Sequence, residues 1–480
     1  MTKNPATDPL AVPAEFLSVL HKQQAAYKRN MNPGLEERRA DLRGLHRLLV
    51  ENHEEIVAAV NEDYGCRCRF ETKFAETYMA QEAILDTIKH LKKWLKPHQR
   101  SLDPTQYPLA KAWTFPQPVG VVGIVVPWNF PIAMTFQPLI GVFAAGNRAM
   151  IKMSENSNTL AMLLKRVSGK YFPEDKLAFF EDGGGRGPQF TSLPFDHIFF
   201  TGSPATGKAV MANAAKNLTP VTLELGGKSP CVVAPDYPIR TAAERIIWAK
   251  MLNAGQICTN VDYLFLPEDK VDEFISEAKD VVSKRFPDIN NGDYTAVIDQ
   301  RSYDRLQKTA ADAVAKGAQL IDLYSGPAAD KARRIMPPRI ALNVDDSMDI
   351  MQREIFGPLL PVVTYQTREE VVEYVADRPR PLAFYLFSND TGLQTFYLNN
   401  TISGGVALNE SVIQAGIHNL PFGGVGNSGM GHYHGYEGFI TFSKLRPVFK
   451  QSPLRTLDLF VPPYKGLPNT LLNIMHRMKS

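Results

Sequence analysis

The spacing of apolar residues separates a helical N-terminal part of the chain from a long region of alternating strands and helices. Between residues 14 and 97, apolar residues recur three and four positions apart, which predicts a series of amphipathic helices. Residues 99–119 change to proline, tyrosine and alternating polar positions. This second pattern predicts extended arms and is compatible with a hairpin.

From residue 119 onward, short apolar runs alternate with helical stretches. The β-branched run 119–126 predicts a buried strand. The further predicted strands are RAMIKM, FDHIFFTG, PCVVAP, YLFLP, RIALNV and LLPVVTY, and the predicted helices cover 132–145, 160–170, 206–217 and 270–286. Because strands that alternate with helices form βαβ units, we expect an α/β fold with two parallel-sheet domains.

One apolar segment has the composition of a membrane span but not its pattern. No Lys, Arg, Asp or Glu occurs between Lys111 and Arg148, yet prolines interrupt the segment every few residues and Asn129 lies within it. A membrane-spanning helix tolerates an occasional proline, not a series of them. We therefore predict a buried strand followed by a buried helix, and no transmembrane segment.

Charge and cysteine content exclude several other classes of protein. The 480 residues carry a net charge of +3, which gives no reason to expect a nucleic-acid partner. The four cysteines lack the spacing of a disulfide scaffold, and Cys66 and Cys68 are too close for a zinc site, so we predict no metal. The N-terminus lacks a charged region followed by an apolar run. We therefore expect no secretory signal and a cytoplasmic protein.

Three short motifs carry residues suited to acyl chemistry. Cys258 follows a small, polar turn, where a thiol can be exposed beside backbone N–H groups. Glu224 lies among apolar residues and glycines, so its pKa should rise towards neutral, as a general base requires. Asn129 is held between two prolines and can donate a hydrogen bond to an oxyanion. Each motif alone has a plain structural alternative: an inert core cysteine, an ordinary strand-end glutamate and a proline-rich turn.

Together these motifs resemble the aldehyde dehydrogenase superfamily, over about residues 20 to 463. The blocks PWNFP, IKMSE, FFTGSPATG, LELGGK, GQIC, EIFGP and LPFGG occur in the family's order. The resemblance implies that Cys258 attacks the aldehyde carbon and that Asn129 and the Cys258 N–H hold the resulting oxyanion. It further implies that Glu224 activates the water that hydrolyses the thioester, giving a carboxylic acid.

The resemblance also implies a site for a nicotinamide dinucleotide. No GxGxxG motif follows a strand; Gly202, Ser203 and Gly207 instead open a helix whose N-terminus would face the pyrophosphate. Lys152 and Glu155 would contact the adenosine ribose, and this carboxylate favours NAD, with NADP left open. Glu354 would hold the nicotinamide ribose and Phe356 would pack beside the ring. Trp128 and Leu225 complete the predicted cofactor set. The family's usual proline after the lysine is Met153 here, which removes no contact.

Within the superfamily, the text LPFGGVGNSGMGHYHGYEGFITFSK is typical of the class 3-like branch and is similar to bacterial coniferyl aldehyde dehydrogenases. We therefore expect oxidation of an aromatic aldehyde, for example coniferyl aldehyde to ferulate. Oxidation of medium- or long-chain fatty aldehydes is the alternative. The predicted substrate pocket consists of Phe130, Met134, Ile257, Thr259, His418 and Phe422; packing in the core is the alternative for several of these residues.

The resemblance implies three structural parts and a homodimer. Residues 1–98 and 120–224 would form the NAD-binding domain, and 225–427 the catalytic domain. Residues 99–119 and 428–480 would form a bridging oligomerisation arm with a C-terminal tail. Apolar residues of the tail 465–480 fall near one helical face, which suits packing on the protein or a partner, or weak contact with a membrane surface.

Two competing activities remain on the same scaffold. A coenzyme A-acylating enzyme would need Glu224 to be absent or silent, and the intact ELGGK motif argues against it. A catalytically inactive structural or binding protein would be expected to lack Cys258, Glu224 or Asn129, and all three are present.

Overall fold

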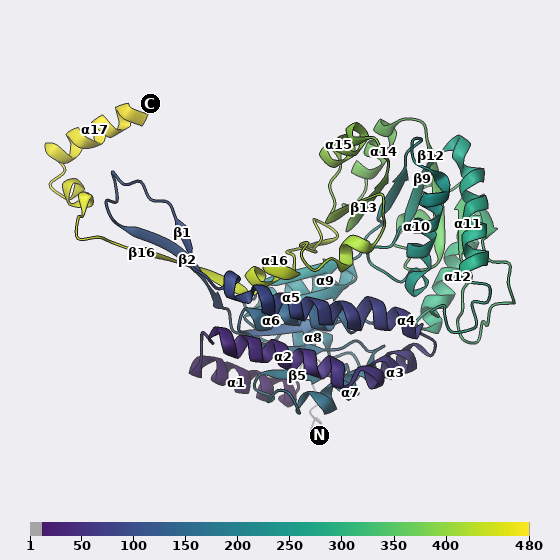
Figure 1. Ribbon diagram of the computed structural model, residues 1–480, viewed down its shortest axis with the longest axis horizontal. Helices are drawn as coiled ribbons and strands as arrows, with labels where there is room; N and C mark the ends of the chain where they lie inside the picture. Colours follow the sequence, from purple (N-terminus) through teal and green to yellow (C-terminus); the bar gives the residue numbers. More distant parts are fainter. Residues whose placement is uncertain (1–11, 480) are drawn as a thin grey trace, which may run out of the picture.

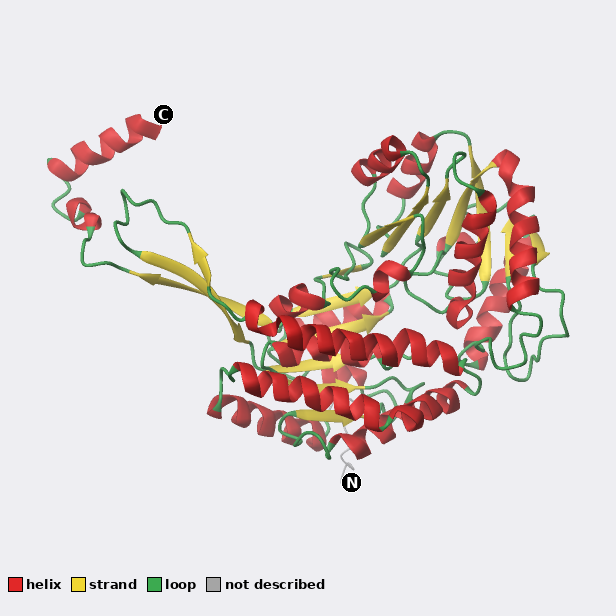
Figure 2. Cartoon of the chain, in the orientation of Figure 1, coloured by secondary structure: helices red, strands yellow, loops and turns green. Residues whose placement is uncertain are grey.

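Three β-sheets organise the chain, of which the computed structural model describes residues 12–479. Figures 1 and 2 show a lower lobe rich in N-terminal helices, an upper lobe made from the middle of the chain, and an arm that projects from the lower lobe. The N-terminal segment 1–11, where we predicted no secretory signal, lies outside the described residues.

The first sheet has six strands in the order β15-β7-β6-β3-β4-β5. All neighbours are parallel except the edge pair β15–β7. Its strands are β3 (Val121–Val125), β4 (Arg148–Lys152), β5 (Leu177–Phe180), β6 (His197–Gly202), β7 (Val221–Leu225) and β15 (Gly429–Met430). The helices between them are α6 (Ala133–Ala144), α7 (Asn158–Ser168), α8 (Gly187–Thr191) and α9 (Pro204–Ala215). The predicted strand–helix alternation over this region is confirmed.

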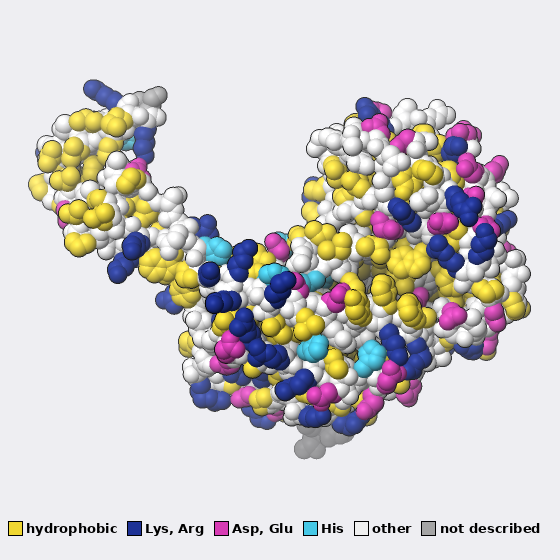
Figure 3. All heavy atoms as spheres, in the orientation of Figure 1, with side chains coloured by type: hydrophobic (Ala, Val, Ile, Leu, Met, Phe, Trp, Pro, Cys, Tyr) yellow, Lys and Arg dark blue, Asp and Glu magenta, His cyan; other side chains and the backbone are white. Residues whose placement is uncertain are grey.

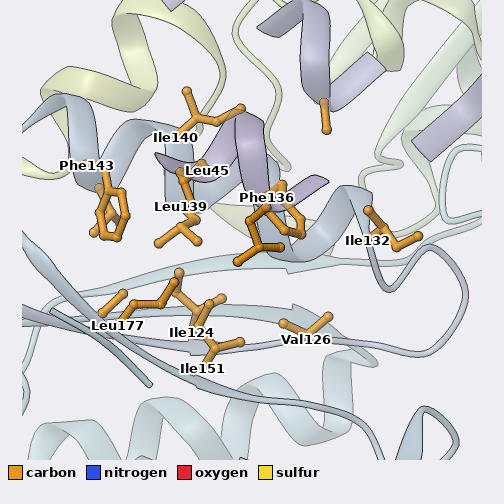
Figure 4. Packing of buried hydrophobic residues seen from close by; sticks show 14 of the residues in the cluster. Leu45, Ile124, Val126, Ile132, Phe136, Leu139, Ile140, Phe143, Ile151 and Leu177 are labelled. Atoms are coloured by element: carbon orange, nitrogen blue, oxygen red, sulfur yellow. The ribbon is translucent and has the colours of Figure 1, made fainter. Parts of the chain in front are cut away.

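The N-terminal helices cover both faces of this sheet. α1 (Ala14–Arg29) packs Phe16 and Leu20 on one face. α2 (Leu35–Glu51), α3 (His53–Tyr64) and α5 (Met79–Trp94) pack with α6 on the other face, and α4 (Arg69–Thr72) and the π-helical turn η1 (Lys73–Tyr78) lie between α3 and α5 in the chain. Figure 4 shows why α6 is apolar on nearly every side: Phe136, Leu139 and Phe143 fill the space between the sheet and Leu45 of α2. The uncharged segment is thus a core helix rather than a membrane span, because a helix covered on both faces needs no polar side.

The second sheet has seven strands in the order β10-β11-β12-β9-β8-β13-β14. Only the edge strand β10 is antiparallel to its neighbour. The strands are β8 (Pro230–Val233), β9 (Tyr263–Pro267), β10 (Gln319–Asp322), β11 (Arg339–Leu342), β12 (Leu359–Tyr365), β13 (Ala383–Phe387) and β14 (Gly405–Leu408). Its helical elements are α10 (Ile239–Met251), η2 (Leu252–Gly255), η3 (Glu268–Lys270), α11 (Val271–Arg285), α12 (Gln300–Ala315), α13 (Asp349–Gln352), α14 (Arg368–Ala376), α15 (Thr391–Asn400) and η4 (Ile413–Gly416).

The arm is a three-stranded antiparallel sheet of β1 (His98–Arg100), β2 (Lys111–Pro118) and β16 (Ser443–Lys450). β1 and β2 are the two strands of the hairpin expected over 99–119. The predicted arm segment 428–480 contains two parts that pack differently. β15 and α16 (Gly435–Thr441) lie on the first sheet and on α5 and α6, whereas β16 joins the arm.

The chain ends with η5 (Thr456–Phe460) and the amphipathic helix α17 (Leu467–Lys479), beyond the tip of the arm. Figure 3 shows apolar side chains gathered over this end of the molecule, and Leu457, Leu459, Leu467 and Met478 are among the exposed ones. Within residues 12–479, no helix combines the length and apolarity that crossing a membrane requires.

Candidate active site

Cys258 follows a strained turn between α10 and β9. Asn253, Ala254 and Gly255 have φ values of 50°, 50° and 76°, three consecutive residues in the left-handed region. A side chain at Gly255 would collide with the backbone carbonyl of Gly357, so only glycine fits there. The turn leaves Cys258 half-buried, whereas the other three cysteines are buried. Non-glycine residues in this conformation are costly, and such strain is concentrated at functional sites.

The Cys258 thiol is protonated near neutral pH with only protein groups around it. Burial, together with the carboxylates of Glu354 and Glu224, raises its pKa to about 12. The backbone N–H groups of Cys258 and Thr259 act in the opposite direction. Two acids therefore lie within electrostatic reach of this thiol, and a positive charge beside it would favour the thiolate.

Glu224 lies near the C-terminal end of β7, and its side chain is buried in the interior. It is 2% exposed, and neither carboxylate oxygen has a well-formed hydrogen bond. Burial raises the pKa of Glu224 well above its usual value, and the nearby N–H of Gly424 offsets this only in part. The sequence predicted this direction, because the neighbours of Glu224 in the chain are apolar residues and glycines. A carboxylate in this state can take a proton from water near neutral pH.

Asn129 is connected to the cysteine loop by its side chain. Its amide Nδ2 donates a hydrogen bond of 3.1 Å to the backbone carbonyl of Gln256. The backbone carbonyl of Asn129 accepts hydrogen bonds from the Tyr64 hydroxyl at 3.0 Å, Arg67 Nη1 at 2.7 Å and Asn253 Nδ2 at 3.1 Å. Three buried donors on one carbonyl hold the PWNFP loop rigidly against the turn before Cys258.

Arg67 belongs to a buried ion pair that the sequence did not reveal. Its Nη2 lies 3.1 Å from Glu76 Oε1, and both side chains are 0% exposed. Glu76 Oε2 in turn accepts from the backbone N–H groups of Ile132 at 2.8 Å and Ala133 at 3.2 Å. The pair thereby connects the N-terminal helices to the start of α6. No local pattern signals such a pair, because its members are isolated charges in helical segments.

The predicted cofactor residues line three adjoining cavities. Lys152 and Glu155 line a first, of about 600 Å³. Trp128, Gly202 and Ser203 line a second, of about 360 Å³, together with Lys152 and Glu155. Glu354 and Phe356 line a third, of about 840 Å³. Gly207 and Leu225 do not line these cavities; a side chain at Gly207 would lie 2.7 Å from Leu225. These two residues instead pack α9 closely on β7.

The groups around these cavities suit a dinucleotide, which has a negatively charged pyrophosphate between its two nucleosides. Ser203 Oγ accepts from the N–H of Thr206 at 3.2 Å at the start of α9, whose first turn opens on the second cavity. Burial and the nearby Asp262 raise the pKa of Glu354 to about 8. The ring of Phe356 lies 5.4 Å from that of Trp128, edge to face. Arg305 lines the third cavity with its buried Nη1 unpaired, a residue that the sequence analysis missed.

Comparison with known proteins agrees with this geometry. A sequence profile of the aldehyde dehydrogenase family matches residues 5–448. The chain belongs to the aldehyde dehydrogenase family. It is therefore an oxidoreductase that acts on aldehydes with a nicotinamide cofactor, and the predicted fold is confirmed.

Relatives of this chain carry the name predicted from the sequence. A probable coniferyl aldehyde dehydrogenase of Pseudomonas aeruginosa is 45% identical over 92% of each chain. A coniferyl aldehyde dehydrogenase of a Pseudomonas species is 40% identical over 95% of each chain. A family 3 aldehyde dehydrogenase of Dictyostelium discoideum is 37% identical over 96% of each chain, in agreement with the class 3-like branch.

Two solved structures share the fold. AldH of Staphylococcus aureus in its substrate-bound state superposes with a TM-score of 0.90 at 32% identity, covering 96% of this chain and 99% of that one. An aldehyde dehydrogenase of Mycobacterium tuberculosis complexed with NAD+ gives a TM-score of 0.82 at 25% identity, covering 93% and 92%.

The residues predicted to line the substrate pocket of this aldehyde dehydrogenase fall into separate groups. Phe130, Met134 and Ile257 belong to one apolar cluster beside the cysteine loop, with Trp248 and Val412. Thr259 and Phe422 line a different cavity, of about 260 Å³. The six-residue pocket thus stays a prediction, with its best support in the first group.

The remaining predicted pocket residue lies among aromatic and polar groups. His418 Nε2 lies 3.1 Å from Thr87 Oγ1 of α5, and its ring is 6.2 Å from that of His434. Beside it, the aldehyde dehydrogenase has a buried tyrosine that the sequence analysis did not select. Tyr433 lies within electrostatic reach of both Glu224 and Cys258 and packs against Phe422 at 5.6 Å.

Proposed function

We propose that this aldehyde dehydrogenase oxidises aromatic aldehydes of the coniferyl type to their carboxylic acids, with NAD as the preferred coenzyme. The names and identities of the two Pseudomonas relatives support the substrate class. The observation that carries the chemistry is the half-buried thiol of Cys258, which follows a left-handed turn and lies within electrostatic reach of the carboxylates of Glu224 and Glu354.

Each catalytic residue has one proposed role. Cys258 Sγ, after its thiol has lost its proton, adds to the aldehyde carbon, and the Asn129 side chain and the Cys258 N–H stabilise the oxygen that becomes negative. Loss of a hydride from that carbon leaves a thioester on Sγ. Glu224 later takes a proton from the water that hydrolyses the thioester. Its burial supports this role, since a carboxylate with a raised pKa is a stronger base than an exposed one.

The residues present fit a nicotinamide dinucleotide. The N-terminus of α9 and the cation of Lys152 suit its phosphates and ribose, and Glu354 Oε1 is buried without a partner in the third cavity. When bound, the dinucleotide supplies the electron acceptor of the oxidation. Glu155, exposed at the edge of two of the cavities, supports NAD over NADP because a 2′-phosphate would approach its carboxylate.

An apolar surface supports an aromatic substrate. Phe130 and Ile257, next in the chain to Asn129 and Cys258, are 9% and 6% exposed and share one apolar cluster. An aldehyde with a flat ring can be held there by apolar contact. A fatty aldehyde is the second candidate, because the apolar side chains of the same cluster would also accept an alkyl chain.

The test is NADH formation by the purified protein with coniferyl aldehyde, cinnamaldehyde, benzaldehyde, hexanal, decanal and succinate semialdehyde. The highest kcat/KM for coniferyl aldehyde would support the proposal. A preference for decanal or hexanal would instead make the enzyme a fatty aldehyde dehydrogenase, and no oxidation of any aldehyde would contradict the proposed mechanism.

We also propose a homodimer that is bridged by the arm. The exposed β1–β2–β16 sheet and the apolar residues after it support an interface with a second copy. Light scattering of the whole chain should give twice the mass of 53.5 kDa. A monomer at micromolar concentration would contradict this assembly.

A further inference from the structure

The first cofactor cavity contains a carboxylate for which the sequence analysis assigned no role. Asp182 lies two residues after β5, beside Lys152 at the end of β4, because these two strands are parallel neighbours with Lys152 opposite Phe180. The Asp182 carboxylate forms an ion pair with Lys152 Nζ. Both side chains are 7% exposed, and both line the cavity with Glu155.

The loop after Asp182 fixes the position of this carboxylate. Asp182 Oδ2 accepts a hydrogen bond of 2.7 Å from the N–H of Gly185. Gly183, Gly184 and Gly185 have φ values of 54°, 98° and 89°, a left-handed run suited to glycine. The turn therefore holds the second oxygen of Asp182 while Oδ1 faces Lys152. The carboxylate is built into the site and cannot move away from an incoming ligand without breaking both contacts.

The charge balance of the cavity follows from these contacts. Among the described residues that line it, Lys152 is the one cation, and Asp182 and Glu155 are two anions. Arg186 follows the glycine turn and its guanidinium packs beside Gly183, but it is not among the residues that line the cavity; it pairs with Glu15 at 4.0 Å. A ribose with two hydroxyl groups can accept hydrogen bonds from Lys152 and donate to carboxylates. A 2′-phosphate carries about two negative charges, and it would lie beside two carboxylates and a lysine that is already paired.

We propose that Asp182 is a determinant of coenzyme specificity, which excludes the 2′-phosphate of NADP by keeping Lys152 neutralised. This inference rests on the proposed placement of the adenosine ribose beside Lys152 and Glu155. Glu155 would repel the 2′-phosphate directly, whereas Asp182 would act by pairing with Lys152. Removing its charge frees Lys152 to pair with a phosphate while leaving the ribose hydroxyl contacts in place.

The experiment compares kcat/KM for NAD and for NADP in four forms of the whole enzyme. Asp182→Asn removes the charge but can still accept from Gly185. Asp182→Glu keeps the charge. The matched control is Glu181→Gln, which makes the same change in net charge one residue away, where the side chain pairs with Lys165 at 3.2 Å outside the cavity.

We expect the ratio of kcat/KM for NADP to kcat/KM for NAD to be about tenfold higher in Asp182→Asn than in wild type. The change should come mainly from a lower KM for NADP, since one negative charge near the 2′-phosphate is removed. Asp182→Glu and Glu181→Gln should keep the wild-type ratio within about twofold, the scatter of a surface change. An unchanged ratio in Asp182→Asn, or an equal rise in Glu181→Gln, would overturn the inference. So would wild-type preference for NADP.

Calorimetric titration of each form with NAD and NADP separates this inference from the proposed function. In one outcome, wild type binds NAD at least about tenfold tighter than NADP and Asp182→Asn reduces this difference in affinity, but no aldehyde is oxidised. Only the proposed reaction then fails. If NAD-linked oxidation proceeds and the binding gap is the same in Asp182→Asn, only the role of Asp182 fails. Binding of neither coenzyme by wild type would overturn both.

Discussion

The side-chain amide of Asn129 donates a hydrogen bond of 3.1 Å to the backbone carbonyl of Gln256, two residues before Cys258. The proposed oxyanion donor is thus held at the cysteine loop by the loop's own backbone. A developing negative charge on the substrate oxygen is a stronger acceptor than a neutral carbonyl, so it can compete for this donor.

Replacing Asn129 should therefore reduce catalysis far more than binding. We expect Asn129→Ala to lower kcat about 10² to 10³-fold, the usual loss for one oxyanion donor, with a small change in KM. Steady-state kinetics with the best aldehyde measures both. Asn399→Ala, exposed on α15, is the control and should leave kcat unchanged. Equal kcat values for the two variants would remove Asn129 from the oxyanion site.

The reactivity of the Cys258 thiol should depend steeply on pH. Burial and two carboxylates raise its pKa to about 12, so the thiolate fraction should grow about tenfold per pH unit between pH 7 and 10. The rate of alkylation by iodoacetamide, followed by mass spectrometry, should grow in the same proportion. A plateau below pH 9 would contradict the raised pKa. Cys258→Ala should abolish turnover yet still bind NAD, whereas Cys231→Ala, in the buried strand β8, should retain turnover.

Glu224→Gln should separate acylation from hydrolysis. Since glutamine cannot accept the proton of water, we expect the first turnover to release NADH rapidly and later turnovers to be about 10² to 10⁴-fold slower, the range for loss of a general base. Stopped-flow absorbance records this burst. Slow linear kinetics without a burst would assign Glu224 to an earlier step.

The pH dependence of the same residue has a defined sign. The pKa of Glu224 is raised in the folded protein, so its basic form, and with it the deacylation rate, should increase as pH rises towards that pKa. Stability should change the other way. A carboxyl group whose pKa is higher in the folded than in the unfolded protein stabilises the folded state at pH values below the unfolded pKa. This stabilisation is lost as the pH rises through the pKa of the folded protein. The melting temperature of wild type should therefore fall relative to Glu224→Gln as pH increases.

The buried pair of Arg67 and Glu76 should be needed for stability and for the position of Asn129. Arg67→Ala leaves Glu76 buried without its cation, which should lower the free energy of unfolding by about 3–5 kcal/mol. Urea denaturation measures this loss. Arg67→Lys keeps the charge but not the two-nitrogen fork that reaches both Glu76 and the Asn129 carbonyl. It should fold and lower kcat more than it changes KM; an unaltered kcat would limit Arg67 to a structural role.

The tail should contribute to assembly rather than to membrane contact. Truncation after residue 464 removes α17, whose apolar residues Leu467, Leu472 and Met478 are exposed in the single chain. We expect truncated and full-length forms to sediment equally with anionic vesicles, and the truncated form to have a lower melting temperature in the dimer. Loss of vesicle binding on truncation would instead support a membrane role.

The sequence by itself determined the elements and the chemistry of this aldehyde dehydrogenase. Apolar spacing predicted the helix α6 and the strands around it, because a run without charges can be stable only inside a core or a membrane and its prolines excluded the latter. Cys258, Glu224 and Asn129 each stand in a short motif that alone has a structural alternative, and the resemblance of the ordered set of motifs to the family implied their roles.

Tertiary structure alone decided which distant residues meet. Arg67 pairs with Glu76 and holds Asn129, and Asp182 reaches Lys152, through packing between elements that are separate in the chain. The six predicted pocket residues likewise fell into separate groups, because neighbours in sequence need not face the same cavity. Local pattern reports the polarity of a position, but pairing of charges and the shape of a cavity depend on long-range contacts that no local pattern contains.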